Sequence, residues 1–178
     1  MVEDEYVRAV QGGTGFTKCG GNYAGSIIGQ VKAEKYGCSQ VLWLDGRERK
    51  YVEEVGTMNA MFIIDRKIIT APCDGTVLPG VTRDSVIQLL KSWGYVVEER
   101  PLAIDELMEA GRNKTLQEAF GTGTAAVISP IGELSYKGES IIINDFQTGE
   151  ITQRLYDTLT GIQWGKLEDS FHWTYEVN

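Results

Sequence analysis

Apolar residues recur along the chain at the spacings of helices and of strands, in alternation. Between about Asn22 and Tyr36 the apolar positions share one helical face, and Gly37 stands where a helix-ending glycine is expected. Those apolar positions are Ala24, Ile27, Ile28 and Val31. They predict an amphipathic helix whose apolar stripe packs into the core.

Three further stretches have the spacing or composition of helices. The first begins at Thr82, which we place as its N-cap, and ends at Gly94. Its apolar stripe consists of Val86, Leu89, Leu90 and Trp93. A short helix is expected over residues 105–110, and a longer one over residues 150–159 that stops before Gly161.

Short apolar runs bounded by turn residues predict the strands. They cover residues 41–44, 61–64, 67–70, 96–102, 125–128, 134–137 and 141–143. Asp45-Gly46 marks a turn after the first run, and Asp65-Arg66 joins the second and third runs into a hairpin. Because helices and strands are interleaved, the pattern predicts a mixed α/β domain with a curved or barrel-like sheet. It leaves the order of the strands open.

Length and charge limit what this domain can bind. A chain of 178 residues is long enough for one domain that buries roughly 70% of its unfolded surface. The net charge of −8 argues against a nucleic-acid partner, which requires a basic surface. It allows a local pocket for a small phosphorylated ligand. No apolar run reaches the roughly 20 residues that span a bilayer, so no membrane association is expected.

The cysteine and histidine content indicates no metal site. The three cysteines lack a CxxC spacing, and a single histidine accompanies them. The acidic first residues contain no secretory leader, and unpaired cysteines suit a reducing compartment. A cytoplasmic location is therefore expected.

Lys18 is the first candidate for chemistry. It lies between the glycine-rich stretch Gly12–Gly15 and Gly20-Gly21, just before the first predicted helix. Glycine lets backbone approach a ligand closely, and a helix N-terminus offers unpaired N–H groups and partial positive charge. If Lys18 were buried there, its pKa would fall toward the neutral amine that a Schiff base needs. The alternative is an ordinary solvated loop lysine.

Two adjacent acids form the second candidate. Glu53 is expected on a solvated face, because adjacent carboxylates are usually exposed. Glu54 instead enters an apolar stretch and the turn Gly56–Asn59. A carboxylate in that position is suited to holding a proton on a ring nitrogen of a ligand.

Two segments with hydroxyl groups are candidates for binding an anion. Leu78–Asp84 is a proline-glycine turn that leads into a helix N-terminus, where N–H groups and the Thr82 hydroxyl converge. The alternative is that Thr82 only caps the helix. Gly121–Ala126 matches the dinucleotide pattern GxGxxA, but the residues that follow are β-branched and end in Pro130, so no helix opens there. We reject the dinucleotide interpretation and keep the phosphate contact.

A lysine, an acid, two anion sites and Tyr23 make up the inventory of a pyridoxal-phosphate (PLP) site. At this point the sequence resembles the fold-type IV PLP enzymes, and specifically the large domain of branched-chain amino acid aminotransferases. The resemblance covers nearly the whole chain, from Glu5 to Thr174. Its most specific blocks are Gly13–Tyr23, Glu54–Asn59, Leu78–Asp84 and Gly121–Ala125.

The resemblance implies a role for each block. Lys18 would form the Schiff base with pyridoxal 5'-phosphate and shuttle the proton, Tyr23 would bond the phenolic oxygen, and Glu54 would pair with the pyridinium nitrogen. The phosphate would be held by Val81, Thr82 and Thr124. The cofactor and substrate pocket would be lined by Thr57, Thr124 and Ala125.

The resemblance also implies a reaction and its partners. The reaction is reversible transamination of leucine, isoleucine or valine with 2-oxoglutarate, in a homodimer. D-amino acid aminotransferase and aminodeoxychorismate lyase are the alternatives of the same fold. They tend to carry a serine-rich turn where this chain has Gly56-Thr57-Met58-Asn59, which favours the branched-chain group.

The resemblance is to one domain of a larger enzyme. The family places a small domain before this one, and residues 1–178 are expected to form the PLP-binding large domain alone. That small domain supplies part of the substrate pocket and a closing loop. The alternative function is therefore a truncated domain that binds PLP without turnover.

Overall fold

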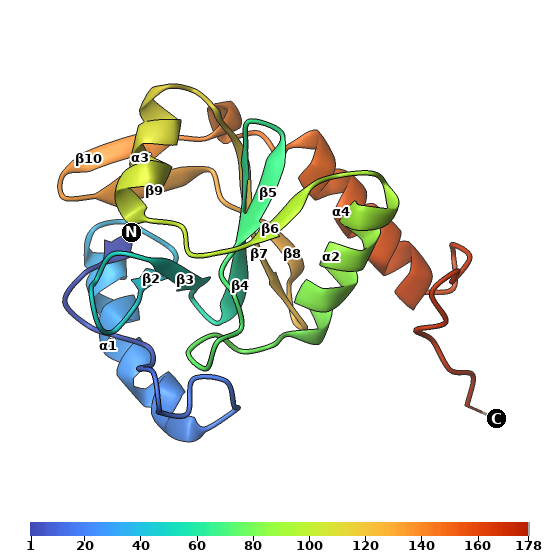
Figure 1. Ribbon diagram of the computed structural model, residues 1–178, viewed down its shortest axis with the longest axis horizontal. Coiled ribbons are helices and arrows are strands. Elements are labelled where there is room, and N and C mark those ends of the chain that lie inside the picture. The colour runs from blue at the N-terminus through green and yellow to red at the C-terminus, as the bar shows by residue number, and fades with distance from the viewer. Residues whose placement is uncertain (178) are drawn as a thin grey trace.

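A branched eight-stranded sheet runs through the centre of the computed structural model, which describes residues 1–177 (Figure 1). Its strands are β1 (Val2–Glu3), β2 (Leu42–Leu44), β3 (Val52–Val55), β4 (Met58–Ile64), β5 (Lys67–Thr70), β6 (Val97–Glu99), β7 (Leu116–Gly123) and β8 (Val127–Pro130). The β1–β2 and β5–β6 pairs are parallel and the other pairs are antiparallel. A separate antiparallel ribbon contains β9 (Glu133–Tyr136) and β10 (Glu139–Ile142). The expected mixed α/β fold is confirmed.

The sheet branches at β4. Strand β7 pairs with β4 from Asn59 to Ile64, whereas the other edge of β4 is shared by β3 near its start and by β5 from Met61 onward. Strands β3 and β5 therefore diverge from one edge of β4. At the point of divergence the Ala60 carbonyl accepts a hydrogen bond from Thr70 Oγ1 at 2.8 Å, so the backbone there stays satisfied without a strand partner.

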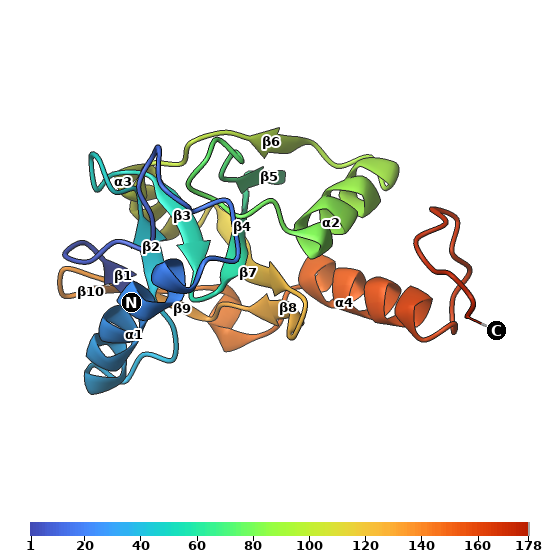
Figure 2. The same cartoon turned by 90° about the horizontal axis from the view of Figure 1, so that it is seen from below.

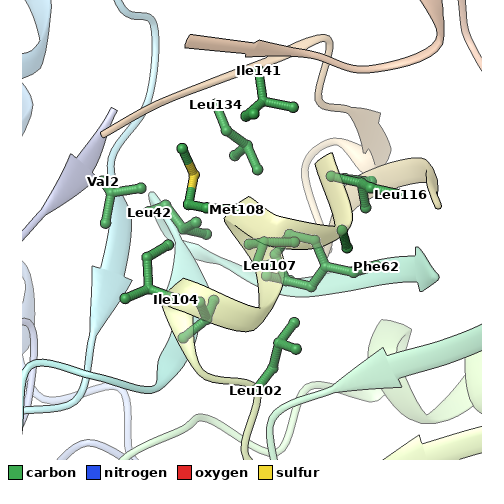
Figure 3. Packing of buried hydrophobic residues seen from close by; sticks show 14 of the residues in the cluster. Val2, Leu42, Phe62, Leu102, Ile104, Leu107, Met108, Leu116, Leu134 and Ile141 are labelled. Atoms are coloured by element: carbon green, nitrogen blue, oxygen red, sulfur yellow. The ribbon is translucent and has the colours of Figure 1, made fainter. Parts of the chain in front are cut away.

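Alternate residues of β4 face two separate hydrophobic cores. Ala60, Phe62 and Ile64 pack with α3 (Ile104–Arg112) and the β9–β10 ribbon (Figure 3). Met61 and Ile63 pack instead with α2 (Val81–Ser92) and α4 (Glu150–Gln163). The alternation follows from the two-residue period of a strand. Figure 1 shows α2 and α4 together on one side of the sheet, with α3 on the other side of β4 and β5 in that view.

Helix α1 (Gly20–Lys35) lies at one end of the molecule, far from α4 (Figure 2). The predicted apolar stripe does not pack into the core, because Ile27, Ile28 and Val31 are all exposed. The helix instead rests on Trp43 through Gly29, where a side chain would collide with the indole ring. The narrow face of the helix packs inward, and the larger apolar residues point away from the sheet.

Several predicted bounds need correction. The strand expected over 96–102 is only β6, and the strand expected from residue 125 begins at Val127 because residues 124–126 form a turn. Helix α2 begins after Gly80, so Thr82 is not its N-cap. Helix α4 continues past Gly161 to Gln163. Strand β7 was not predicted, because Gln117, Glu118 and two glycines interrupt its apolar pattern.

Two findings concern what the fold does not contain. Among residues 1–177 no helix has both the length and the apolar composition needed to cross a bilayer. The same described part of the chain holds no cluster of three or more histidine, cysteine or acidic side chains arranged to bind a metal ion.

Candidate active site

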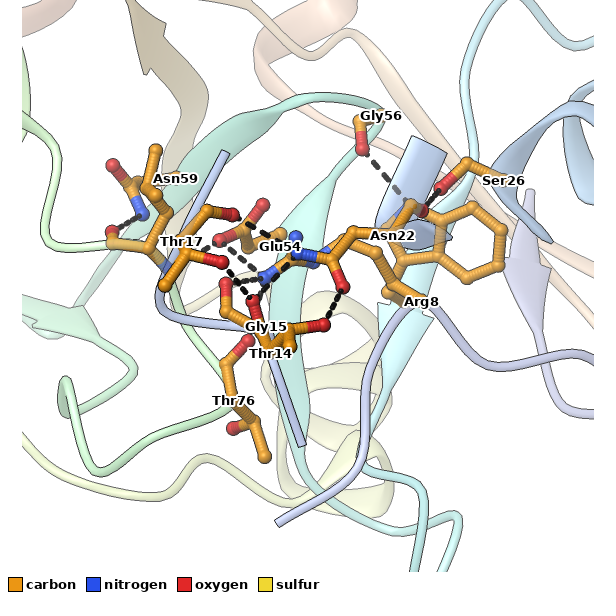
Figure 4. A network of polar contacts seen from close by, with 12 residues as sticks. Arg8, Thr14, Gly15, Thr17, Asn22, Ser26, Glu54, Gly56, Asn59 and Thr76 are labelled. Carbon is orange, nitrogen blue, oxygen red and sulfur yellow. Dashed lines mark hydrogen bonds and ion pairs between the residues drawn. The ribbon is translucent and has the colours of Figure 1, made fainter. Parts of the chain in front are cut away.

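The loop that carries Lys18 is clamped to the start of α1 by Asn22. The Asn22 amide donates to the carbonyls of Thr14 (2.7 Å) and Thr17 (3.0 Å), and its oxygen accepts from the Thr14 hydroxyl at 2.9 Å (Figure 4). Asn22 is buried, so these bonds are shielded from competing water. The backbone before Lys18 is therefore fixed, although Lys18 itself belongs to no regular element.

The side chain of Lys18 is exposed, and its Nζ lies 6.0 Å from the centroid of the Tyr23 ring. Burial, which we expected as one means of favouring the neutral amine, does not act on Lys18 in this structure. The amine instead stands at the rim of a cleft, next to Tyr23 of the first turn of α1. A ligand that enters the cleft would be in reach of both side chains.

Glu54 lies under this loop and is held by a buried arginine that sequence reasoning missed. Arg8 Nη2 is 3.1 Å from Glu54 Oε1 and donates to the carbonyls of Gly15 (2.9 Å) and Thr76 (2.5 Å). The Leu78 amide also donates to Glu54 Oε1, at 2.8 Å. A single guanidinium thus joins the glycine loop, the acid on β3 and the segment after β5. No spacing in the sequence marks Arg8 for this role.

Burial dominates the electrostatics of Glu54. The residue is only 3% exposed, and burial raises its pKa above the ordinary value of 4.5. The charges of Arg8 and Lys18 and the hydrogen bond from Leu78 act in the opposite direction. Glu54 is therefore a carboxyl group that is set to share a proton with a nitrogen placed above it.

A cleft of about 630 Å³ opens between the Lys18 loop, the β3–β4 turn, the start of α2 and the β7–β8 turn. All the predicted site residues except Glu54 line it: Lys18, Tyr23, Thr57, Val81, Thr82, Thr124 and Ala125. Glu54 lies beneath the cleft and is bonded to Leu78, which lines it. Four blocks that are distant in the sequence therefore meet in one place.

The N-terminus of α2 is the part of the cleft best suited to an anion. Gly80 is the N-cap and no side chain caps the helix, so the Thr82 capping alternative is wrong. The first N–H groups of α2 thus remain available, with the partial positive charge of the helix end. Asn59 fixes the approach of the chain, because its amide donates to the Leu78 carbonyl at 2.8 Å.

The β7–β8 turn forms the opposite wall. Thr124 and Ala125 are exposed in a tight turn and are not the start of a helix, which confirms the rejection of a dinucleotide fingerprint. Thr122, just before this turn, was missed. Its side chain lines the cleft and is 1% exposed, and its Oγ1 has no hydrogen-bond partner among the described residues. A buried unpartnered hydroxyl facing a cleft is suited to a polar ligand.

Glu53 is not on a solvated face, contrary to expectation. It is 6% exposed, because the loop after β5 covers β3 on the side away from Glu54. Burial raises the pKa of Glu53 to about 7. Two adjacent carboxylates are thus both buried, on opposite faces of one strand.

Comparison with known proteins places the chain in a family. Residues 17–134 match the family described as amino-transferase class IV. A probable branched-chain-amino-acid aminotransferase of Staphylococcus epidermidis is 57% identical over 176 residues, and branched-chain-amino-acid aminotransferase 2 of Bacillus subtilis is 58% identical over the same length. Each alignment covers 99% of this chain, but only 49% and 48% of those two relatives. The chain therefore spans about half the length of the curated relatives that it matches.

Solved structures agree with the sequence match. The branched-chain amino acid aminotransferase of Escherichia coli superposes with a TM-score of 0.83 at 30% identity, over 99% of this chain and 55% of that one. The T.th. enzyme complexed with N-(5'-phosphopyridoxyl)-L-glutamate gives a TM-score of 0.81 at 29% identity, over 98% of this chain and 55% of that one. The match of residues 17–134 covers most of the described fold. This chain belongs to the class IV amino-transferase family.

Proposed function

We propose that this chain is the PLP-holding domain of a branched-chain amino acid aminotransferase, with Lys18 as its Schiff-base lysine. The observation that carries the proposal is the convergence of Lys18, Tyr23, Thr82 and Thr124 on one cleft above Glu54. The names of the relatives from Staphylococcus epidermidis and Bacillus subtilis support the substrate class. The phosphopyridoxyl group in the complex of the T.th. enzyme supports the cofactor.

The residues of the cleft fit a phosphorylated pyridine. The uncapped start of α2, with Val81 and Thr82, offers N–H groups and a hydroxyl to the phosphate. Thr124 and the unpartnered Thr122 hydroxyl add donors from the opposite wall. A ring between these walls would have Lys18 and Tyr23 on one side and the Glu54 carboxyl beneath it.

When bound, PLP supplies an electron sink that stabilises the carbanion formed at the α-carbon of an amino acid. The protein's part is to position and to move protons. Glu54 keeps a proton on the ring nitrogen, and Arg8 keeps Glu54 in place. Lys18 Nζ anchors the cofactor and then accepts and returns the α-proton. Thr57 and Ala125 border the space left for the amino acid, whose partner is a 2-oxo acid such as 2-oxoglutarate.

The first test is attachment of PLP. The chain would be incubated with PLP, desalted, reduced with borohydride and digested, and the peptide that gains the pyridoxyl phosphate group identified by mass spectrometry. We expect modification of the peptide that contains Lys18, and loss of the visible absorbance band in Lys18→Ala. Lys35→Ala, at the exposed end of α1, is the matched control and should keep the band. Attachment mainly to other lysines would refute the assignment.

The second test is turnover. Leucine would be added to the PLP-loaded chain, and the corresponding 2-oxo acid would be measured in a single cycle. Product that depends on Lys18 would support an aminotransferase reaction by this half of the enzyme. Attachment of PLP without product would favour the alternative, a PLP-binding domain that does not turn over. The specific observation for that alternative is the coverage of only about half of each curated relative.

A further inference from the structure

Two buried carboxylates lie on either side of one buried guanidinium. Glu53 and Glu54 are 6% and 3% exposed, and Arg8 is 7% exposed. Arg8 forms its ion pair with Glu54 at 3.1 Å, and its positive charge also acts on Glu53. The positive charge of Arg8 can balance only one of the two negative charges. A second uncompensated charge in this interior would be costly.

Thr76 connects the two carboxylates. Its hydroxyl bonds to the Glu53 side chain, and its carbonyl accepts from Arg8 Nη2 at 2.5 Å. Within the described residues, Glu53 Oε2 and Arg8 Nε are buried without any hydrogen-bond partner. An ionised Glu53 would therefore leave an oxygen without a donor, whereas a protonated Glu53 would not carry this charge.

A cavity of about 210 Å³ gives Glu53 a route to solvent. It is lined by Glu53 and Thr76 and also by the exposed residues Glu48 and Asp74. The charged and titratable groups that face Glu53 or its partner carboxyl are Arg8, Lys18, Asp45, Arg47, Glu48, Glu54 and Asp74. Most of those lining the cavity are acidic. The cavity therefore favours a proton on Glu53 and lets that proton exchange with water.

We propose that Glu53 is a positioning residue that holds a proton so that Arg8 remains wholly available to Glu54. With the proton on Glu53, Arg8 pairs with a single ionised carboxylate. With Glu53 ionised, two negative charges compete for Arg8, and the grip of Arg8 on Glu54 weakens. The link from Glu54 to a cofactor ring rests on the proposed function, but the coupling between Glu53 and Arg8 is a property of this chain alone.

The test is a carboxyl-carbon and arginine-nitrogen NMR titration of the chain without PLP. We expect the Glu53 carboxyl carbon to titrate with a midpoint of about 7, and the Arg8 Nε shift to follow the same midpoint. In Glu53→Gln the Arg8 shift should stay flat over that range. In Thr76→Val the Glu53 midpoint should rise, because the Thr76 hydroxyl stabilises the ionised form. Glu109→Gln, an exposed change on α3, should change none of these curves.

Two results would overturn the proposal. One is a Glu53 midpoint near the roughly 4.3 of an exposed glutamate. The other is an Arg8 shift that keeps its neutral midpoint in Glu53→Gln. If Glu53→Gln does not fold, Thr76→Val decides, and an unchanged Glu53 midpoint there refutes the link. Failure of PLP to attach to Lys18 would refute the proposed function and leave this coupling intact, because the titration contains no cofactor.

Discussion

The contact between α1 and Trp43 allows a stability prediction from atomic distances. A methyl group added at Gly29 would lie 2.5 Å from Trp43 Cη2, 3.2 Å from Cζ3 and 3.5 Å from Cζ2. The indole cannot move freely, because it is 1% exposed and its Nε1 donates to the Gly56 carbonyl at 2.9 Å. Overpacking of this kind costs about 1–3 kcal/mol. The gain in helix propensity from glycine to alanine, about 1 kcal/mol, opposes it.

Gly25 on the same helix separates these two effects. A methyl group there would meet nothing closer than the Val7 carbonyl oxygen at 3.7 Å, an ordinary contact. Gly25→Ala should therefore show the propensity gain alone and be stabilised by up to about 1 kcal/mol. Gly29→Ala should be less stable than Gly25→Ala by about 1–3 kcal/mol. Urea unfolding followed by far-ultraviolet circular dichroism measures both variants.

A double-mutant cycle identifies the colliding ring. Trp43→Phe removes the outer ring atoms that the new methyl group would meet. The cost of Gly29→Ala should therefore shrink by about 1 kcal/mol or more when phenylalanine occupies position 43. Equal stabilities of Gly29→Ala and Gly25→Ala in the wild-type background would show that α1 does not rest on Trp43 as described. Strict additivity in the cycle would contradict the role of the indole.

Three further predictions concern carboxylates. Glu118 accepts from the Ile151 and Thr152 amides at 3.1 and 2.8 Å, so Glu118→Gln should lower the urea-unfolding free energy by about 1–3 kcal/mol; an unchanged value would disprove this cap. Partial burial raises the pKa of Asp45, but four backbone N–H groups lower it below 3.8, so Asp45→Asn should remove stability that wild type keeps above pH 3.8 and loses below it. The folded-state pKa of Glu53, about 7 against 4.5, predicts roughly 3 kcal/mol of stability that is complete below pH 4.5 and lost as the pH rises through 7. Melting curves of Glu53→Gln should lack that fall.

Local signals predicted much of this fold. Gly37 and Gly94 follow the ends of α1 and α2 with φ of +73° and +84°, the left-handed conformation that helix-ending glycines adopt. The central strands β2 and β5 were predicted because β-branched and aromatic residues cluster in short runs. In each case the residues that determine the element lie within a few positions of it.

The missed features depend on distant partners. The periodicity of α1 indicated an apolar face but could not show that Gly29, not Ile28, meets the sheet. Glu53 is buried because the loop containing Thr76 covers it. Arg8 gained its role from a carboxylate that lies 46 positions later in the sequence.

The site was found better than its supports were. Lys18, Thr57, Thr82 and Thr124 were predicted as parts of one site and do line one cleft. Their motifs are local and rich in glycine and hydroxyl residues, which makes them visible in sequence. The groups that hold them in position are single buried side chains, which no spacing rule distinguishes from ordinary core residues.

The attachment of residues 4–19 to the rest of the molecule has a consequence for hydrogen exchange. This segment contains no helix or strand, and its polar anchors are few: Arg8 to the β3 side and Asn22 to the Lys18 loop. Such a segment is expected to open without global unfolding, while the two cores around β4 remain closed. Its amides should exchange faster than those of β4. A ligand that bridges Lys18 and α2 would slow that exchange in proportion to its affinity, so protection of this segment would report occupancy of the cleft directly.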